Sequence, residues 1–156
     1  MNQNEDVQSL VLNYLKKLDD SLLPVLEQII QQRYPLEVTT LAFEIFSDQF
    51  SEQFPIRVFF LDENHTEFFA IVNGEARYPS VIDPSLIMID GVYPREFEAK
   101  CLSQGIDIWT VSSKVCMQWF IENWNKAGGT DFKLYATIAP HDSAEKFDLV
   151  EQTWLE

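Results

Sequence analysis

Histidine and cysteine are scarce in this chain, with two of each among 156 residues. These residue types supply most transition-metal ligands, and a catalytic zinc site typically takes three protein ligands. The sequence has no His-x-x-x-His pair, no Cys-x-x-Cys pair and no calcium-loop spacing. We therefore expect no bound metal and no other cofactor. We interpret the two thiols, Cys101 and Cys116, as buried and reduced.

Motifs of nucleophilic catalysis and phosphate binding are also missing. Gly-x-Ser-x-Gly does not occur, and Gly128-Gly129 follows a predicted helix, so we interpret it as a helix stop and not as a phosphate loop. His141-Asp142 has the composition of a general base and its orienting carboxylate, but such partners usually meet in space and not along the chain. His65 and His141 both fall in predicted hairpin loops, so a non-enzymatic protein is the favoured interpretation.

Positive charge is in short supply. Eleven Lys and Arg stand against 25 Asp and Glu, which gives a formal net charge of −14. Such a chain repels phosphate backbones and anionic lipids, so we expect neither a nucleic-acid nor a membrane partner. No apolar run reaches the roughly 20 residues of a membrane span, and residues 1–6 are too polar for a signal peptide, so we expect a cytoplasmic protein. The charge favours a basic protein as partner; alternatively, it only keeps an apolar-rich chain soluble.

Apolar residues are abundant enough to build one core. They make up 46% of the chain, and Phe alone occurs 12 times. A chain of this length buries roughly 70% of its unfolded surface without help from a metal or a disulfide. No repeat or long linker divides the sequence, so we expect one domain over residues 1–156.

Helical periodicity of apolar residues predicts two helical segments at the N-terminus, over residues 7–18 and 19–34. Asp19-Asp20-Ser21 is expected to cap the second segment, with Pro24 in its first turn. The alternative is a single helix that is kinked at Pro24.

Two more helices are predicted after Pro94, over residues 96–103 and 107–127, with Asp107 as the cap of the longer one. The longer helix has a wide apolar arc, which is typical of a deeply buried helix. Its large aromatic residues are therefore interpreted mainly as core. These are Trp109, Trp119, Phe120 and Trp124.

Short apolar or alternating segments predict the strands. They cover residues 41–45, 56–61, 68–72, 132–139 and 147–155. Residues 68–72 are apolar on both faces, so we expect a central, covered strand there. Because helices and strands are grouped and not alternating, the sequence predicts an α+β fold. We expect a mostly antiparallel sheet of about five strands with helices packed against it.

Residues 73–94 are predicted to form a long structured loop, and loops of this length are often functional. Two tyrosines in it lie outside regular structure and are therefore candidate binding anchors. Acidic residues in this loop and in the preceding one flank the same predicted surface. The candidate partner contacts are Asp62, Glu63, Tyr78, Asp83, Asp90 and Tyr93.

Three hypotheses follow from these features. The first is a non-enzymatic, acidic protein-binding domain, in its concrete form a bacterial immunity-type inhibitor that docks on a basic toxin. The second is a small-ligand-binding protein or hydrolase-like enzyme, whose site forms where the 73–94 loop meets the His141-Asp142 hairpin. The third is a homo-oligomer, such as a dimer, held through the long helix or through residues 147–155.

Overall fold

The structure is a computed structural model that describes residues 3–155, and it confirms the α+β class. The helices are α1 (Gln3–Lys16), α2 (Asp19–Gln31), α3 (Arg95–Ser103), α4 (Ile108–Lys126) and the short 3₁₀ helix η1 (Gly129–Asp131). The strands are β1 (Thr40–Ile45), β2 (Ile56–Leu61), β3 (Ala70–Val72), β4 (Glu75–Arg77), β5 (Tyr135–Pro140), β6 (Lys146–Asp148) and β7 (Thr153–Leu155).

The main sheet has five strands, as expected, in the order β2-β1-β5-β6-β7. It is mixed and not purely antiparallel, because β1 and β5 run parallel, with Thr40 opposite Tyr135 and Ile45 opposite Pro140. The other neighbouring pairs are antiparallel. A parallel pair requires a long crossover, and here the connection from β1 to β5 contains both α3 and α4.

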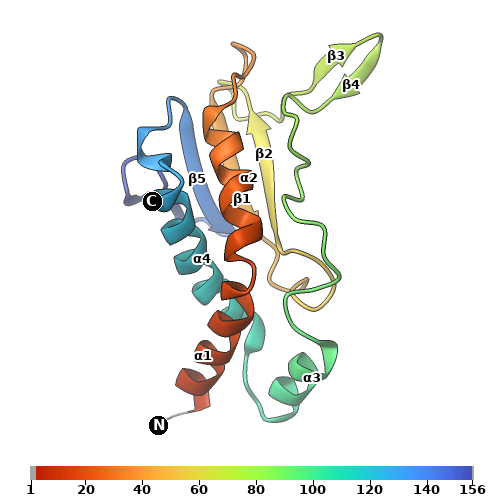
Figure 1. Cartoon of the computed structure of the whole chain (residues 1–156), viewed down its shortest axis with the longest axis vertical. Coiled ribbons are helices and arrows are strands. Elements are labelled where there is room, and N and C mark those ends of the chain that lie inside the picture. Colours follow the sequence, from red (N-terminus) through yellow and green to blue (C-terminus); the bar gives the residue numbers. More distant parts are fainter. Residues whose placement is uncertain (1–2, 156) are drawn as a thin grey trace.

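Helices α2 and α4 lie on one face of the sheet, and α1 packs along α4 beyond the end of the sheet (Figure 1). Alternate side chains of β1 and β2 point into this helical layer and are buried, as the two-residue strand period requires. In β1 the ring of Phe43 lies 4.8 Å from that of Phe120 and 5.6 Å from that of Trp124. The aromatic residues of α4 are therefore core, as predicted, except for the exposed Trp109.

The predicted cap of α4 is confirmed. One carboxylate oxygen of Asp107 accepts a hydrogen bond from the backbone N–H of Thr110 at 3.3 Å, and the other accepts one from the Thr110 hydroxyl at 2.7 Å.

We expect Asp107→Ala to lower the free energy of unfolding by about 1 kcal/mol because the backbone N–H of Thr110 loses its acceptor. Urea denaturation measures the loss. Asp107→Asn retains a capping oxygen and should stay close to wild type; equal stability of Asp107→Ala and wild type would contradict this role.

The expected cap of the second helix is wrong. α2 begins after Leu18, which makes no side-chain capping bond, and Pro24 lies inside the helix. Asp19 instead accepts a hydrogen bond from the indole N–H of Trp119 at 2.6 Å, across the interface with α4. Tertiary contact thus uses the carboxylate that the local pattern assigned to capping. The helix is interrupted between Lys16, where α1 ends, and Asp19, where α2 begins. The alternative of a single helix kinked at Pro24 is therefore also excluded.

The predicted strand over residues 147–155 is in fact two strands, β6 and β7, that pair with each other. A turn separates them because the Asp148 carboxylate accepts hydrogen bonds from the N–H groups of Val150 and Glu151, both at 2.9 Å. Gln152 then adopts a positive φ of 60°. Apolar composition alone did not reveal this Asp-centred turn.

Candidate functional site

The β3–β4 hairpin stands outside the main sheet and projects from the body of the molecule (Figure 1). Its two-residue turn is Asn73-Gly74, with φ values of 53° and 81°, as a type I′ turn requires. The expectation of a central, covered strand at 68–72 is therefore wrong. Ile71 is 70% exposed, because the strand pairs only with β4. The Asn-Gly turn between Val72 and Glu75 was the sequence signal for this hairpin.

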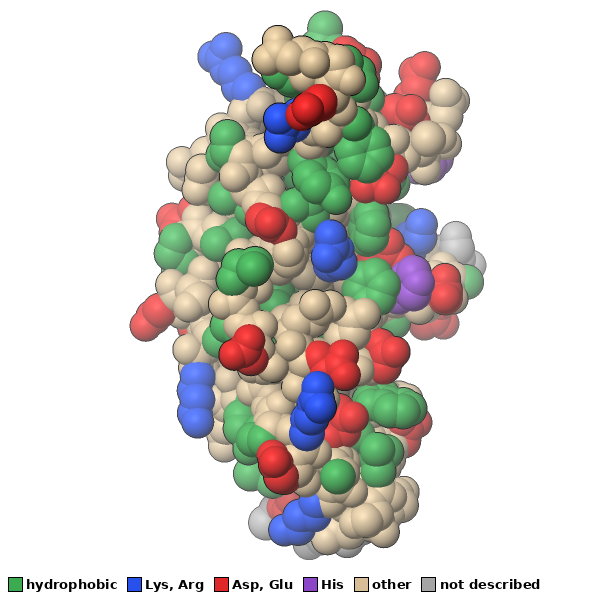
Figure 2. All heavy atoms as spheres, turned by 90° about the vertical axis from the view of Figure 1, so that its right-hand side faces the viewer, with side chains coloured by type: hydrophobic (Ala, Val, Ile, Leu, Met, Phe, Trp, Pro, Cys, Tyr) green, Lys and Arg blue, Asp and Glu red, His purple; other side chains and the backbone are tan. Residues whose placement is uncertain are grey.

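Exposed apolar side chains lie on the hairpin and along the segment that follows it. We define the hairpin patch as Phe69, Ile71, Val72, Tyr78, Val81 and Met88, all of which are exposed. The rings of Phe69 and Tyr78 pack on each other, with centroids 5.4 Å apart. Figure 2 shows this side of the molecule, with hydrophobic side chains interspersed among Asp and Glu. Exposed apolar clusters with a polar surround are typical of binding surfaces.

Three of the six predicted partner contacts lie near the base of this hairpin. Asp62 shapes the loop between β2 and β3, because its carboxylate accepts hydrogen bonds from the N–H groups of Asn64 and Thr66 at 2.9 and 3.0 Å. Glu63 follows it and is exposed. Tyr78 is exposed and packs on Phe69 as described above.

Asp83 and Asp90 lie on the segment that runs past the outer edge of β2. The N–H of Val58 in β2 donates to the carbonyl of Pro84 at 3.0 Å, so this segment covers part of the sheet edge. The Ser85 hydroxyl and backbone N–H both donate to the Asp83 carboxylate, and these bonds lower the pKa of that carboxyl. Asp83 is therefore firmly ionised at neutral pH, and both aspartates are exposed.

The sixth residue, Tyr93, is not placed to contact a partner. It is only 3% exposed, its ring stacks on Phe50 with centroids 5.7 Å apart, and its hydroxyl lies 3.0 Å from that of Ser112. Burial raises the pKa of the Tyr93 hydroxyl. The residue does lie outside regular structure, as predicted, but rings from α1 and α3 cover it, and it belongs to the core.

Negative charge is concentrated where the β1–β2 connection meets the start of α3. The N–H of Val92 donates to the carbonyl of Phe50 at 2.6 Å, so the segments 48–52 and 90–98 lie side by side. We define the acidic corner as the carboxylates of these two segments: Asp48, Glu52, Asp90, Glu96 and Glu98. Arg95 is the one basic residue of both segments and pairs with Glu52 at 3.8 Å. The corner therefore keeps a net negative charge.

His141 is held by two carboxylates. Its Nδ1 lies 3.1 Å from Glu44 Oε1, its Nε2 lies 3.4 Å from Asp142 Oδ2, and its ring stacks on Phe46 at 4.4 Å. With both ring nitrogens facing carboxylates, neither is directed at a substrate in the way that general-base chemistry needs. The partner from across the fold, Glu44, was not recognisable from sequence because it lies 97 positions away.

His65 lines a hollow of about 320 Å³ on the sheet face that the helices leave open. The segment 140–146, which contains His141-Asp142, contributes Pro140, Ser143 and Lys146 to this hollow. Residues 73–94 contribute no side chain to it. The two segments that the enzyme hypothesis requires therefore do not meet there.

Both thiols are buried, as predicted, and burial raises the pKa of Cys101 and Cys116, so neither is a reactive thiolate at neutral pH.

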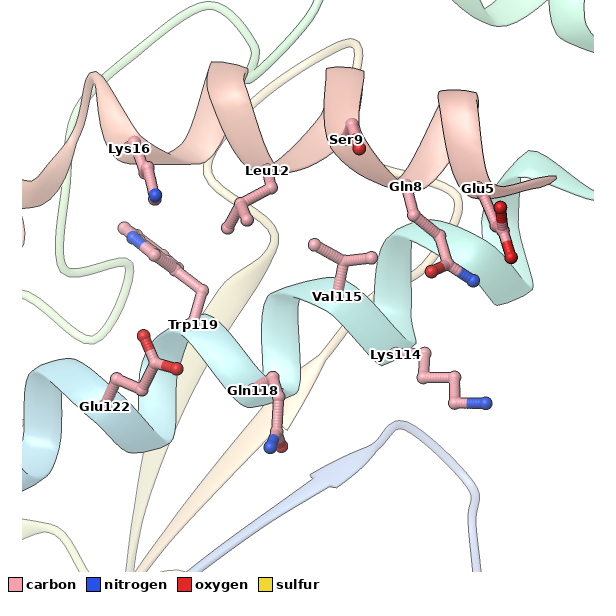
Figure 3. Close-up of a pocket in the computed structure, with 10 residues that line it drawn as sticks. All are labelled: Glu5, Gln8, Ser9, Leu12, Lys16, Lys114, Val115, Gln118, Trp119 and Glu122. Atoms are coloured by element: carbon pink, nitrogen blue, oxygen red, sulfur yellow. The ribbon is translucent and has the colours of Figure 1, made fainter. Parts of the chain in front are cut away.

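A groove of about 540 Å³ lies between α1 and α4 (Figure 3). Leu12, Val115 and Trp119 form its apolar part, and Trp119 is fixed by its bond to Asp19. The rims carry mixed charge, with Lys16 and Glu122 at one end. Among residues 3–155, no imidazole or thiol lines it. The groove is thus a solvated seam between two helices and offers no catalytic constellation.

Comparison with protein-family models, with curated proteins and with solved structures finds no significant match to the chain. Within residues 3–155, no helix is long and apolar enough to cross a membrane. In the same range, no three His, Cys, Asp or Glu side chains are grouped so as to hold a metal ion. The candidate functional site is the hairpin patch together with the predicted acidic contacts Asp62, Glu63, Asp83 and Asp90.

Proposed function

We propose that the chain is a non-enzymatic, acidic protein-binding domain that docks a basic protein through the hairpin patch. The observation that carries this proposal is the β3–β4 hairpin, which holds apolar side chains in solvent outside the main sheet. An isolated two-stranded hairpin is only marginally stable in water. A partner that covers Ile71 and Val72 would remove apolar surface from water and rigidify the hairpin.

Charge supports the choice of a basic partner. The chain has 14 more carboxylates than Lys and Arg side chains (25 − 11), so internal pairing cannot neutralise its surface. Asp62, Glu63, Asp83 and Asp90 lie on the hairpin and loop side of the molecule, where they accelerate encounter with a positive surface. Apolar anchors then supply most of the affinity. An immunity-type inhibitor that covers the basic surface of a toxin is the concrete form of this proposal.

A homo-oligomer is a second candidate, favoured by one observation. β7 is an edge strand of the main sheet, and it exposes Trp154 and Leu155. Edge strands present unpaired backbone groups to a second chain. A doubled mass in solution that Trp154→Glu returns to the monomer value would support this candidate and not the hairpin proposal.

The docking proposal is tested with paired surface variants. We expect Ile71→Ser/Val72→Ser to weaken binding of the captured basic protein at least tenfold, because exposed apolar anchors dominate interface affinity. The matched control is Leu10→Ser, which removes an exposed apolar side chain from α1 and should bind like wild type. The protein captured from cells that express this chain is identified by mass spectrometry and purified. Its affinity is then measured by calorimetry at about 50 mM and about 300 mM salt.

Affinity should fall as salt rises, and thermal unfolding of the double variant should match that of wild type, because neither side chain is in the core. An acidic partner, a salt-independent affinity, or equal binding by wild type and the double variant would contradict the proposal.

A further inference from the structure

A hollow of about 740 Å³ lies between α4 and the C-terminal strands, on the side of α4 away from α1. In Figure 3, Lys114 and Gln118 point from α4 away from α1, and both also line this second hollow. Its other walls come from Ser47 after β1, from the end of β5 and its connection to β6, and from Trp154 of β7. The volume falls within the range of small-molecule sites, roughly 300–1,000 Å³.

The apolar walls of this hollow suit a flat ring. Met117 of α4 is a flexible thioether that adapts its shape to a ligand and contacts aromatic rings favourably. Trp154 offers a large ring that is 58% exposed, and the edge contact with Phe147, at 5.3 Å between centroids, holds it in place. Aromatic side chains of this kind stack on planar ligands.

Ser113 provides an unmet hydrogen bond in the same hollow. The residue is 7% exposed, and its Oγ is buried with no hydrogen-bond partner in the described structure. By contrast, the hydroxyls of Thr110 and Ser143, which also line the hollow, donate to Asp107 and to the carbonyl of Glu145. A buried hydroxyl left unpaired costs about 1–3 kcal/mol, a loss that a ligand group could offset.

The charges in the hollow balance. Lys114 and Glu145 both line it, one positive and one negative. The net charge of the chain, −14, disfavours an anion. A cation would be attracted by Glu145 but repelled by the ammonium group of Lys114, so the hollow gives it no net local attraction. An uncharged molecule meets neither penalty.

We propose that this hollow binds an uncharged, planar heteroaromatic molecule with a single N–H or O–H group that hydrogen-bonds Ser113. The ring lies against Met117 and Trp154, and the hydrogen bond fixes its orientation. Met117 moves aside to admit the polar group, as its three rotatable side-chain bonds allow.

Two matched probes test the proposal. Indole carries an N–H donor, and benzothiophene has the same fused bicyclic shape without a donor. Binding is followed by the NMR shifts of the Met117 methyl group and the Trp154 indole. We expect indole to shift both signals and to bind wild type about tenfold more tightly than benzothiophene, the effect of one net hydrogen bond.

Ser113→Ala separates a binding role from a structural one. Removing an unpaired hydroxyl should leave the melting temperature unchanged or raise it, while the preference for indole over benzothiophene disappears. Trp154→Ala, an exposed change, should weaken both probes. Ile71→Ser/Val72→Ser should leave both affinities unchanged, so this result is independent of the docking proposal.

Several results would overturn the proposal. These are an absence of shifts at Met117 and Trp154, equal affinity of wild type for both probes, or an indole preference that survives in Ser113→Ala. Shifts of Trp154 on simple dilution, together with a doubled mass, would instead assign this surface to a second copy of the chain.

Discussion

Gly129→Ala should lower the free energy of unfolding by about 3 kcal/mol, because the added methyl group has no room. A Cβ at position 129 would overlap the Nε1, Cε2 and Cδ1 atoms of the Trp124 indole. That ring is fully buried between Phe43 and Phe132, and its N–H donates to the carbonyl of Leu149 at 3.1 Å. The indole therefore cannot move aside without breaking this bond or its ring contacts.

Gly128→Ala is the matched control one residue earlier. Gly128 has a φ of +89°, and a Cβ there would meet nothing within 4 Å. Only backbone strain opposes the substitution, and we expect a loss of about 1 kcal/mol. Urea denaturation followed by tryptophan fluorescence measures both variants. Equal losses at the two positions would show that the Trp124 side chain does not pack on Gly129.

The helix before this glycine pair was predictable because its signals are local. Asp107 and the Gly128-Gly129 pair mark the two ends of α4 in the sequence, and the structure places the helix between them at Ile108–Lys126. β1 and β2 were predictable for the same reason, because alternation of apolar residues survives in a sheet with one buried face.

The parallel pairing of β1 with β5 was not predictable in this way. A strand with one buried face has the same alternation whether its neighbour is parallel or antiparallel. The pairing depends on the crossover through α3 and α4, which spans the middle of the chain and leaves no mark in either strand.

Residues 68–72 show why apolar composition misled in one place. Phe69, Ile71 and Val72 have the composition of a central strand, yet they are exposed. An apolar segment that stays exposed has the same composition as one that joins the core, and only the Asn73-Gly74 turn distinguished them. The converse holds for Tyr93, a loop residue that rings distant in sequence bury.

The candidate site was therefore predictable in its acidic part and not in its apolar part. Asp62, Glu63, Asp83 and Asp90 were assigned to loops because Asp, Gly, Pro and Asn mark turns, and the structure places all four in connections between elements. Their role in partner binding remains a prediction. To predict the hairpin patch, one would have to know which apolar segments do not join the main sheet.

A pair of substitutions tests whether helices cover only one face of the sheet and leave the other face open. The pair is Phe43→Ala and Phe59→Ala. Phe43 and Phe59 lie on the paired strands β1 and β2 but on opposite faces of the sheet. Phe43 is 1% exposed and packs on Phe120 of α4, whereas Phe59 is only partly buried. We expect Phe43→Ala to lower the free energy of unfolding by about 4 kcal/mol, through lost burial and the cavity left behind.

Phe59→Ala should lose only about 1 kcal/mol, because its ring is already partly exposed to water and no closed cavity forms. Urea denaturation measures both changes. Equal losses would mean that a further layer covers the open face, which would close the hollow at His65 to ligands. A large difference would leave this face free, as the two-layer arrangement of helices on one side of the sheet requires.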